Sequence, residues 1–156
     1  MKSTDNEKYT RYSVFSAAGK LFGLELSKVM EVLQPPEVTK IPNMRSHVLG
    51  VYNLRGKIIT LVDIRQILGL NQIKDTKSDM VILLKNADFT ISFRVDRVLD
   101  FVEIKDSEIQ PAKANIPSSI ARYLKGIYQE KSMGEVYVFE TDKLLNAKEL
   151  LGRKSR

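Results

Sequence analysis

The sequence predicts a mainly β fold made of two similar β-subdomains, with short helices and a helix near the C-terminus. Three observations predict it: short runs that alternate apolar and polar residues, turn signals at intervals of about ten residues, and an internal repeat. Alternation with a period of two is typical of half-buried strands. Many short strands separated by turns indicate small barrels or a sandwich.

The strands follow from this alternation and are bounded by turn residues. In chain order we expect them over residues 9–15, 21–26, 28–33, 48–54, 57–62, 80–84, 89–95 and 135–139. The first strand should place Tyr12 and Val14 on the face opposite Ser13 and Phe15. Turns are expected at residues 18–20 and 55–56, and the Gln34-Pro35-Pro36 segment should end the third strand.

Helical periodicity is brief. It is visible over residues 63–68, 118–123 and 141–151. The last segment begins with Thr141 and Asp142, whose side chains suit a helix N-terminus, and ends at Gly152.

Two ordered pairs of segments suggest an internal duplication. Residues 29–33 resemble 95–99 with an offset of 66, and residues 49–52 resemble 125–128 with an offset of 76. The difference implies an insertion of about ten residues, placed in the polar stretch 105–114. We expect subdomains over about 9–70 and 78–151, joined near 71–77; chance similarity between β-rich segments is the alternative.

Composition excludes several kinds of site. The chain of 156 residues has no Cys and a single His, which excludes disulfides, zinc–thiolate sites, iron–sulfur clusters and multi-histidine metal sites. No phosphate-binding glycine motif or nucleophile elbow is present, and His47 is expected to be a surface loop residue. We therefore expect no enzyme activity and no cofactor.

The net charge of +6 does not by itself indicate a nucleic-acid partner. Half of it comes from Arg153, Lys154 and Arg156 in the tail 152–156, which we expect to be disordered. Elsewhere acids and bases are interspersed, as on an ordinary solvated surface. No apolar run approaches the roughly 20 residues that span a bilayer, and no signal-peptide pattern is present, so a cytoplasmic location without membrane insertion is expected.

The turn between the fourth and fifth expected strands is the candidate binding feature. Gly56 suits a positive φ, and the Asn53 side chain suits a hydrogen bond to nearby backbone. Arg55 offers a planar donor fork for a carboxylate, and Glu31, the only charge in residues 29–33, is a plausible partner. The alternatives are a solvated turn arginine and an edge-strand charge that prevents aggregation.

Around these residues the chain resembles the CheW family, the adaptor proteins of bacterial chemosensory systems. Thr60 departs from the resemblance, where the family usually has Pro, as do Phe93 and Arg94, where small or aliphatic residues are more frequent. The resemblance covers about residues 12–150 and is carried by segments 22–24, 28–32, 39–43, 50–56, 58–65, 95–98 and 124–127.

The resemblance implies a single CheW-like domain over 1–156, with two SH3-like five-stranded β-barrel subdomains. It implies a non-enzymatic adaptor without cofactor or metal, associated with membrane-anchored receptor arrays. The implied partners are the cytoplasmic hairpin tip of a methyl-accepting chemoreceptor and the regulatory domain of a CheA-type histidine kinase, which has the same fold. Glu31 and Arg55 are implied to pair. The residues implied at or beside the receptor groove between the subdomains are Val29, Glu31, Val32, Asn53, Leu54 and Arg55, with Gly56 as the structural turn.

Three alternatives remain at this point. The same fold could serve a non-flagellar chemosensory pathway, such as pilus motility or second-messenger control. The net charge and the six Tyr and six Phe residues also fit a small nucleic-acid-binding barrel, although the aromatic residues alternate into strand interiors. An unrecognised hydrolase is disfavoured because the usual motifs are missing.

Overall fold

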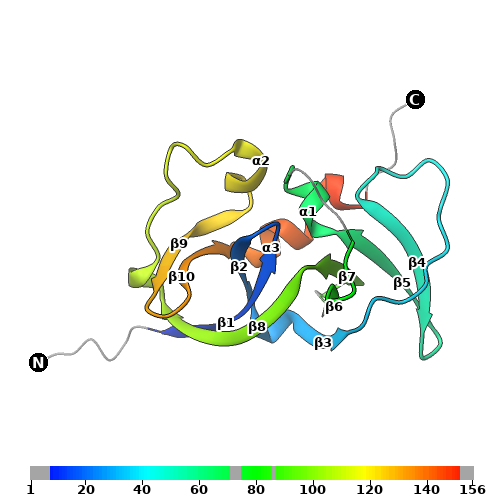
Figure 1. The fold of residues 1–156 in the computed structure, drawn as a ribbon, viewed down its shortest axis with the longest axis horizontal. Helices are drawn as coiled ribbons and strands as arrows, with labels where there is room; N and C mark the ends of the chain where they lie inside the picture. Colours follow the sequence, from blue (N-terminus) through cyan, green and yellow to red (C-terminus); the bar gives the residue numbers. More distant parts are fainter. Residues whose placement is uncertain (1–7, 71–74, 86, 152–156) are drawn as a thin grey trace, which may run out of the picture.

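Ten strands and a few short helices form the fold in the computed structural model, which describes residues 8–70, 75–85 and 87–151 (Figure 1). The strands are β1 (Tyr9–Ala17), β2 (Lys20–Glu25), β3 (Val29–Leu33), β4 (Val48–Leu54), β5 (Lys57–Asp63), β6 (Met80–Lys85), β7 (Thr90–Val95), β8 (Arg97–Lys105), β9 (Leu124–Glu130) and β10 (Gly134–Phe139). The α-helices are α1 (Ile64–Ile67), α2 (Ser118–Ala121) and α3 (Thr141–Leu145). The 3-10 helices are η2 (Leu26–Lys28), η3 (Asp106–Glu108) and η4 (Lys148–Leu150).

The strands form two five-stranded sheets with the same internal order. Sheet A has the order β8-β1-β2-β10-β9, and sheet B has the order β3-β6-β7-β5-β4. At each position in the order, the strand numbers of the two sheets differ by five: β8 corresponds to β3, β1 to β6, β2 to β7, β10 to β5 and β9 to β4. The expected mainly β fold with two five-stranded units is confirmed, and the topology supports duplication.

The expected boundaries of the two subdomains are wrong. β1 and β2 pair within the sheet that contains β8, β9 and β10, whereas β3–β5 join β6 and β7. Each sheet therefore takes strands from both halves of the chain, because the chain crosses between the sheets at η2 and again between β7 and β8. Part of the expected junction at 71–77, and the tail 152–156, lie outside the described residues.

Strand register also corrects the first offset of the repeat. Val29 pairs with Leu84 just before a bulge in β3, and Val98 pairs with Phe15 just before a bulge in β8. Val29 and Val98 are thus equivalent, with an offset of 69 rather than 66. The second offset of 76 is confirmed, because Gly50 and Gly126 occupy equivalent places opposite β5 and β10.

The two equivalent glycines are required by a close approach of two chain segments. Thr39 bridges Val51, and in the other half Gln110 bridges Ile127. A Cβ atom at Gly50 would overlap the carbonyl oxygen of Thr39, and one at Gly126 would overlap that of Gln110. Only glycine lets the backbones come this close.

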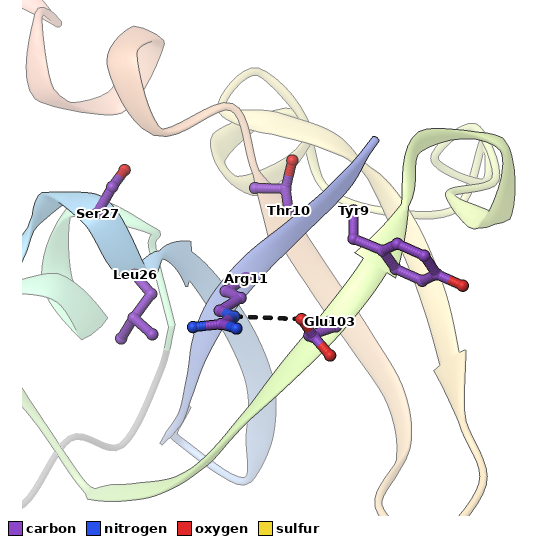
Figure 2. A pocket seen from close by; sticks show the side chains of 6 residues that line it. All are labelled: Tyr9, Thr10, Arg11, Leu26, Ser27 and Glu103. Atoms are coloured by element: carbon purple, nitrogen blue, oxygen red, sulfur yellow. Dashed lines mark hydrogen bonds and ion pairs between the residues drawn. The ribbon is translucent and has the colours of Figure 1, made fainter. Parts of the chain in front are cut away.

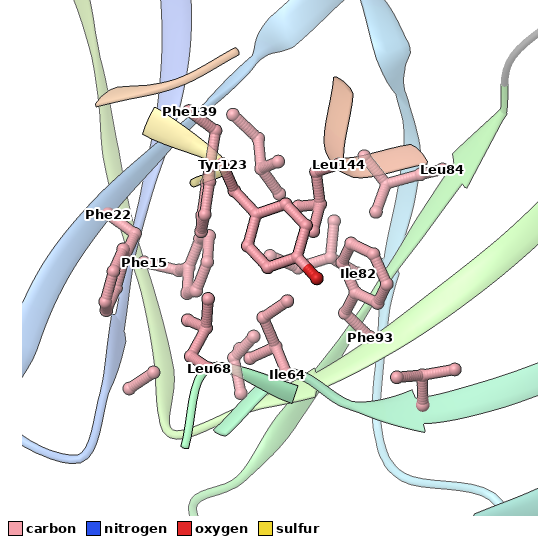
Figure 3. Packing of buried hydrophobic residues seen from close by; sticks show 14 of the residues in the cluster. Phe15, Phe22, Ile64, Leu68, Ile82, Leu84, Phe93, Tyr123, Phe139 and Leu144 are labelled. Atoms are coloured by element: carbon pink, nitrogen blue, oxygen red, sulfur yellow. The ribbon is translucent and has the colours of Figure 1, made fainter. Parts of the chain in front are cut away.

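One apolar cluster is shared by the two sheets (Figure 3). Sheet A contributes Phe15, Phe22 and Phe139, whose rings stack with centroids 5.3–6.3 Å apart. Each sheet also covers a smaller cluster of its own, which consists of Tyr12, Val14, Ile104, Val136 and Val138 in sheet A and of Tyr52, Ile59, Leu61, Val81 and Leu83 in sheet B. Tyr12 and Val14 thus lie on the face opposite Phe15, as the alternation predicts.

Most expected elements are present, with some differences. The strands β8 and β9 were not expected, since polar residues interrupt the alternation in both and a glycine does so in β9. The helix expected over 141–151 is broken after Leu145, and Thr141 does not cap it. Instead the buried Thr141 hydroxyl accepts a hydrogen bond from the Glu25 backbone N–H, 3.1 Å away. Within residues 8–70, 75–85 and 87–151, no helix is both long and apolar enough to cross a membrane.

A buried arginine connects α1 to the chain segments around β6 and β7. Arg65 is 2% exposed, and its guanidinium contacts Asp63, Asp75, Asp79 and Asp96 at 2.9–3.3 Å. Burial disfavours the charge of Arg65, but these carboxylates outweigh it and hold its pKa above the ordinary value. Burial also disfavours the charge of Asp79 and so acts to raise its pKa, but hydrogen bonds from Arg94 and Thr76 and the charge of Arg65 hold that pKa below its usual value. The cluster fixes the position of the segment that follows β5.

Arg65→Ala is expected to destabilise the protein by about 3–5 kcal/mol, because it leaves buried carboxylates without their cation. Urea unfolding followed by circular dichroism measures this. Arg97→Ala, which removes an exposed arginine from β8, should change the free energy of unfolding little. Equal effects of the two substitutions would contradict a structural role for the cluster.

The lowered pKa of Asp79 predicts a loss of stability in acid. Since the folded carboxyl has the lower pKa, its contribution to stability is complete above the usual aspartate value of about 3.9. It is lost as the pH falls through the folded-state pKa, because the unfolded chain then binds more protons. We expect a lower urea midpoint at about pH 3 than at about pH 6, and a smaller difference in Asp79→Asn. An unchanged difference in the variant would assign the effect to other groups.

Candidate functional site

The tip of the β4–β5 hairpin has the backbone geometry of a tight two-residue turn. Leu54 pairs with Lys57, which leaves Arg55 and Gly56 as the loop. Both have positive φ, 50° at Arg55 and 87° at Gly56, as in a type I′ turn. The Gly56 N–H donates to the Asn53 side-chain oxygen at 3.0 Å. The backbone roles expected for Asn53 and Gly56 are confirmed, whereas the positive φ of Arg55 was not expected.

The Arg55 guanidinium forms a two-pronged ion pair with Glu31. The two hydrogen bonds measure 3.0 Å to Oε1 and 2.8 Å to Oε2. The Arg55 hydrogen bond lowers the pKa of Glu31, and the same bond raises the pKa of Arg55. The pairing expected from sequence is therefore present, with Glu31 held as a carboxylate.

This ion pair joins the two outer strands of sheet B. Glu31 belongs to β3 and Arg55 to the loop directly after β4, and β3 and β4 are the opposite edges in the sheet order. The pair therefore spans the gap between two edges that share no backbone ladder. It lies at the rim of the sheet and leaves the Arg55 side chain 69% exposed.

Arg55 is not the residue that would give the turn its greatest stability. Asn-Gly is the favoured pair for this turn type, and a long side chain at positive φ is disfavoured. An exposed ion pair contributes little in return. A residue that costs backbone free energy without a matching gain is typical of a functional position.

The predicted site residues are only partly available at the surface. Asn53 is exposed, and Val32 is 40% exposed on β3. Val29 instead packs against the cluster shared by the sheets, and Leu54 packs against the small cluster of sheet B. The apolar surfaces of Val29 and Leu54 are therefore used largely inside the protein.

Several exposed apolar residues were missed from the sequence. Met30 is 49% exposed on β3, and Ile58 is 67% exposed on β5. On β8, Leu99 is 37% and Phe101 48% exposed. Met30 could have been found, because in a strand it lies on the same face as Val32, a predicted site residue; Leu99 and Phe101 could not, because β8 was not expected.

An open groove of about 540 Å³ lies where β1, β8 and η2 meet (Figure 2). On one side of it the Arg11 guanidinium pairs with Glu103 at 3.2 Å, and the same guanidinium lies 5.7 Å from the centre of the Phe101 ring. Leu26 and Ser27 of η2 form the opposite side, where the chain passes from sheet A towards β3. The groove is thus bordered by the connection between the two sheets.

His47 is buried, which corrects the expectation of a surface loop residue. It is 7% exposed, and its Nε2 lies 2.9 Å from the carbonyl oxygen of Leu150. The ring connects the start of β4 to the C-terminal η4, a structural role. Among the described residues, no group of three or more His, Cys, Asp or Glu is placed to hold a metal ion.

Comparison with known proteins points to one family. The family model for the CheW-like domain matches residues 11–149. A chemotaxis protein CheW of Helicobacter pylori is 28% identical over 70% of this chain and 67% of its own length, and one of Thermotoga maritima is 26% identical over 84% of each. Protein PilI of Pseudomonas aeruginosa is 22% identical over 75% of this chain and 66% of its own length.

A solved structure agrees with this result. The crystal structure of the scaffolding protein TtCheW from Thermoanaerobacter tengcongensis has a TM-score of 0.78 and 25% sequence identity. It covers 93% of this chain and 100% of that one.

Replacing Arg55 tests the balance of forces at the turn. Arg55→Asn removes the ion pair but introduces a residue that tolerates positive φ, whereas Arg55→Ala only removes the pair. We expect the melting temperature of the Asn variant to equal or exceed that of the wild type. The Ala variant should melt about 2–4 °C below the Asn variant. Equal losses in both variants would show that the ion pair, not the backbone, governs stability here.

Proposed function

Because the chain belongs to the CheW-like domain family, we propose that it is a non-enzymatic adaptor that couples a chemoreceptor to a CheA-type histidine kinase. The receptor partner is the cytoplasmic tip of its helical hairpin, and the kinase partner is the regulatory domain. Relatives of this chain include chemotaxis proteins CheW and a CheW described as a scaffolding protein. The arrangement of exposed apolar residues and of the Glu31–Arg55 pair supports these particular partners.

The observation that carries the proposal is a pair of exposed sheet edges beside the connection between the sheets. β3 presents Met30 and Val32, and β8 presents Leu99 and Phe101. An amphipathic helix is recognised by apolar contacts spaced along a groove. The groove of Figure 2 lies beside β8, and polar side chains make up most of its lining, so the apolar contacts would come from the exposed residues of β3 and β8 themselves.

A second surface suits the kinase. The β4–β5 hairpin carries Ile58 on the face of Asn53, its cross-strand partner, and Arg55 lies at the tip. Ile58, which is 67% exposed, and Arg55 at the tip would offer a partner one apolar and one charged contact. A receptor on the sheet edges and a kinase on this hairpin would contact neighbouring elements of one small domain.

To transmit a signal, the adaptor must contact its two partners differently in the active and inactive states. The adaptor transmits only as far as its contacts differ between the active and inactive arrangements of its two partners. Assembly of many copies into arrays then strengthens individually modest contacts.

The similarity to Protein PilI supports a second candidate, the same adaptor role in another chemosensory pathway. The two candidates share the fold and the docking surfaces and differ in the partners. Pull-down of the cognate kinase by the purified protein distinguishes them.

Arg55→Glu tests the proposed function. It replaces the Glu31–Arg55 attraction by repulsion at the rim, so receptor-dependent kinase activation should be lost while the protein stays folded by circular dichroism. Binding to the isolated kinase regulatory domain and to the receptor hairpin should weaken at least about tenfold in one or both cases.

The control is Lys143→Glu on α3, which makes the same charge change at an exposed site and should couple normally. The double variant Glu31→Arg with Arg55→Glu should recover part of the activity. Normal activation by folded Arg55→Glu would exclude a role of the ion pair in coupling.

A further inference from the structure

The repeat places two similar three-residue motifs on the two outer strands. Since Val29 and Val98 are equivalent and each precedes a bulge, Met30-Glu31-Val32 on β3 corresponds to Leu99-Asp100-Phe101 on β8. Each motif has an acidic residue between two exposed apolar residues. The offset of 66 inferred from sequence aligns Glu31 with Arg97, so this correspondence is visible only with the offset of 69 given by strand register.

The two acidic residues differ in their partners. Glu31 is neutralised by the two hydrogen bonds from Arg55. The Asp100 side chain accepts the Phe101 backbone N–H at 3.0 Å, and among the described residues it forms no ion pair. The carboxylate therefore stands exposed between two apolar side chains without a cation of its own.

The hairpin that would supply the cation is closed in a different way. The position of Arg55 corresponds to Lys131 in the β9–β10 hairpin, whose loop is one residue longer because Glu130 pairs with Gly134. Glu130 Oε1 accepts hydrogen bonds from the Ser132 N–H, the Ser132 hydroxyl and the Met133 N–H, at 2.6–2.9 Å. These bonds close the loop on itself, and no ion pair joins Lys131 to Asp100 within the described part of the chain.

We propose that Asp100, with Leu99 and Phe101, binds a basic side chain of a docked receptor helix and so determines which receptor this adaptor accepts. The proposal rests on the proposed function. Its occupant is an amphipathic helix with a Lys or Arg flanked by apolar residues on one face. Charge complementarity requires the cation, since β8 offers an uncompensated carboxylate where β3 offers a neutralised pair.

The shape of β8 favours a helix over an added strand. Two residues, Leu99 and Asp100, lie opposite the single Val14 of β1, which makes a bulge in the middle of the edge. A bulge breaks the regular spacing of backbone donors and acceptors that strand addition needs. Side chains, rather than the backbone, are therefore the recognition elements here.

The test measures binding of the full-length protein to the cytoplasmic hairpin of a cognate chemoreceptor, by fluorescence anisotropy at low and high salt. Asp100→Lys should weaken binding at least about tenfold, and Asp100→Asn severalfold, with a smaller salt dependence than the wild type. Glu37→Gln removes an exposed loop carboxylate and should bind normally. Because Asp100 is exposed, circular dichroism and melting temperature should be unchanged in all variants.

Reversing the charge of single basic residues on the receptor hairpin locates the partner. One such Lys→Glu or Arg→Glu change should restore binding to Asp100→Lys and weaken binding to the wild type. Wild-type affinity of folded Asp100→Lys for the receptor hairpin would overturn this inference and leave the proposed function standing. No binding of the wild type to any receptor hairpin would overturn both.

Discussion

Two sheets that bury one face each on the same apolar cluster are the constraint on which the structure depends. The stacked rings of Phe15, Phe22 and Phe139 meet Phe93 and Ile82 from the other sheet (Figure 3). Because each half of the chain contributes strands to both sheets, neither half can bury its apolar face alone. The crossings at η2 and at the β7–β8 connection follow from this arrangement, and in the described part of the chain no strand pairs with the outer side of β3 or β8 beside them.

The candidate site is a consequence of those free edges. In sheet B the Glu31–Arg55 pair joins the two outer strands at the rim, with side chains in place of a backbone ladder. In sheet A the corresponding charges are not joined, because the β9–β10 loop is closed by Glu130 instead. Duplication thus supplied two copies of one edge, and small changes in loop length and charge made them chemically different surfaces.

Sequence reasoning succeeded where the signal was local. The turn at Arg55–Gly56 is specified by its own residues, and the role of Asn53 follows from one hydrogen bond within the hairpin. The pairing of Glu31 with Arg55, proposed from the residues and implied by the family resemblance, is present. Reasoning failed for His47 and Thr141, whose polar groups bond to Leu150 and Glu25, far away in the chain. No role was predicted for Arg65, because three of its four carboxylate partners lie at least ten residues away in the chain.

The sequence by itself determined which faces are apolar, where the chain turns, and that the pattern occurs twice. It did so because a period of two and the φ preferences of Gly and Asn act between near neighbours. Only the tertiary structure decided which strands pair, that the halves exchange strands, and that Glu31 corresponds to Asp100 rather than to Arg97. Pairing joins residues distant in the chain, and one bulge shifts the register of everything after it, so no local pattern specifies these relations.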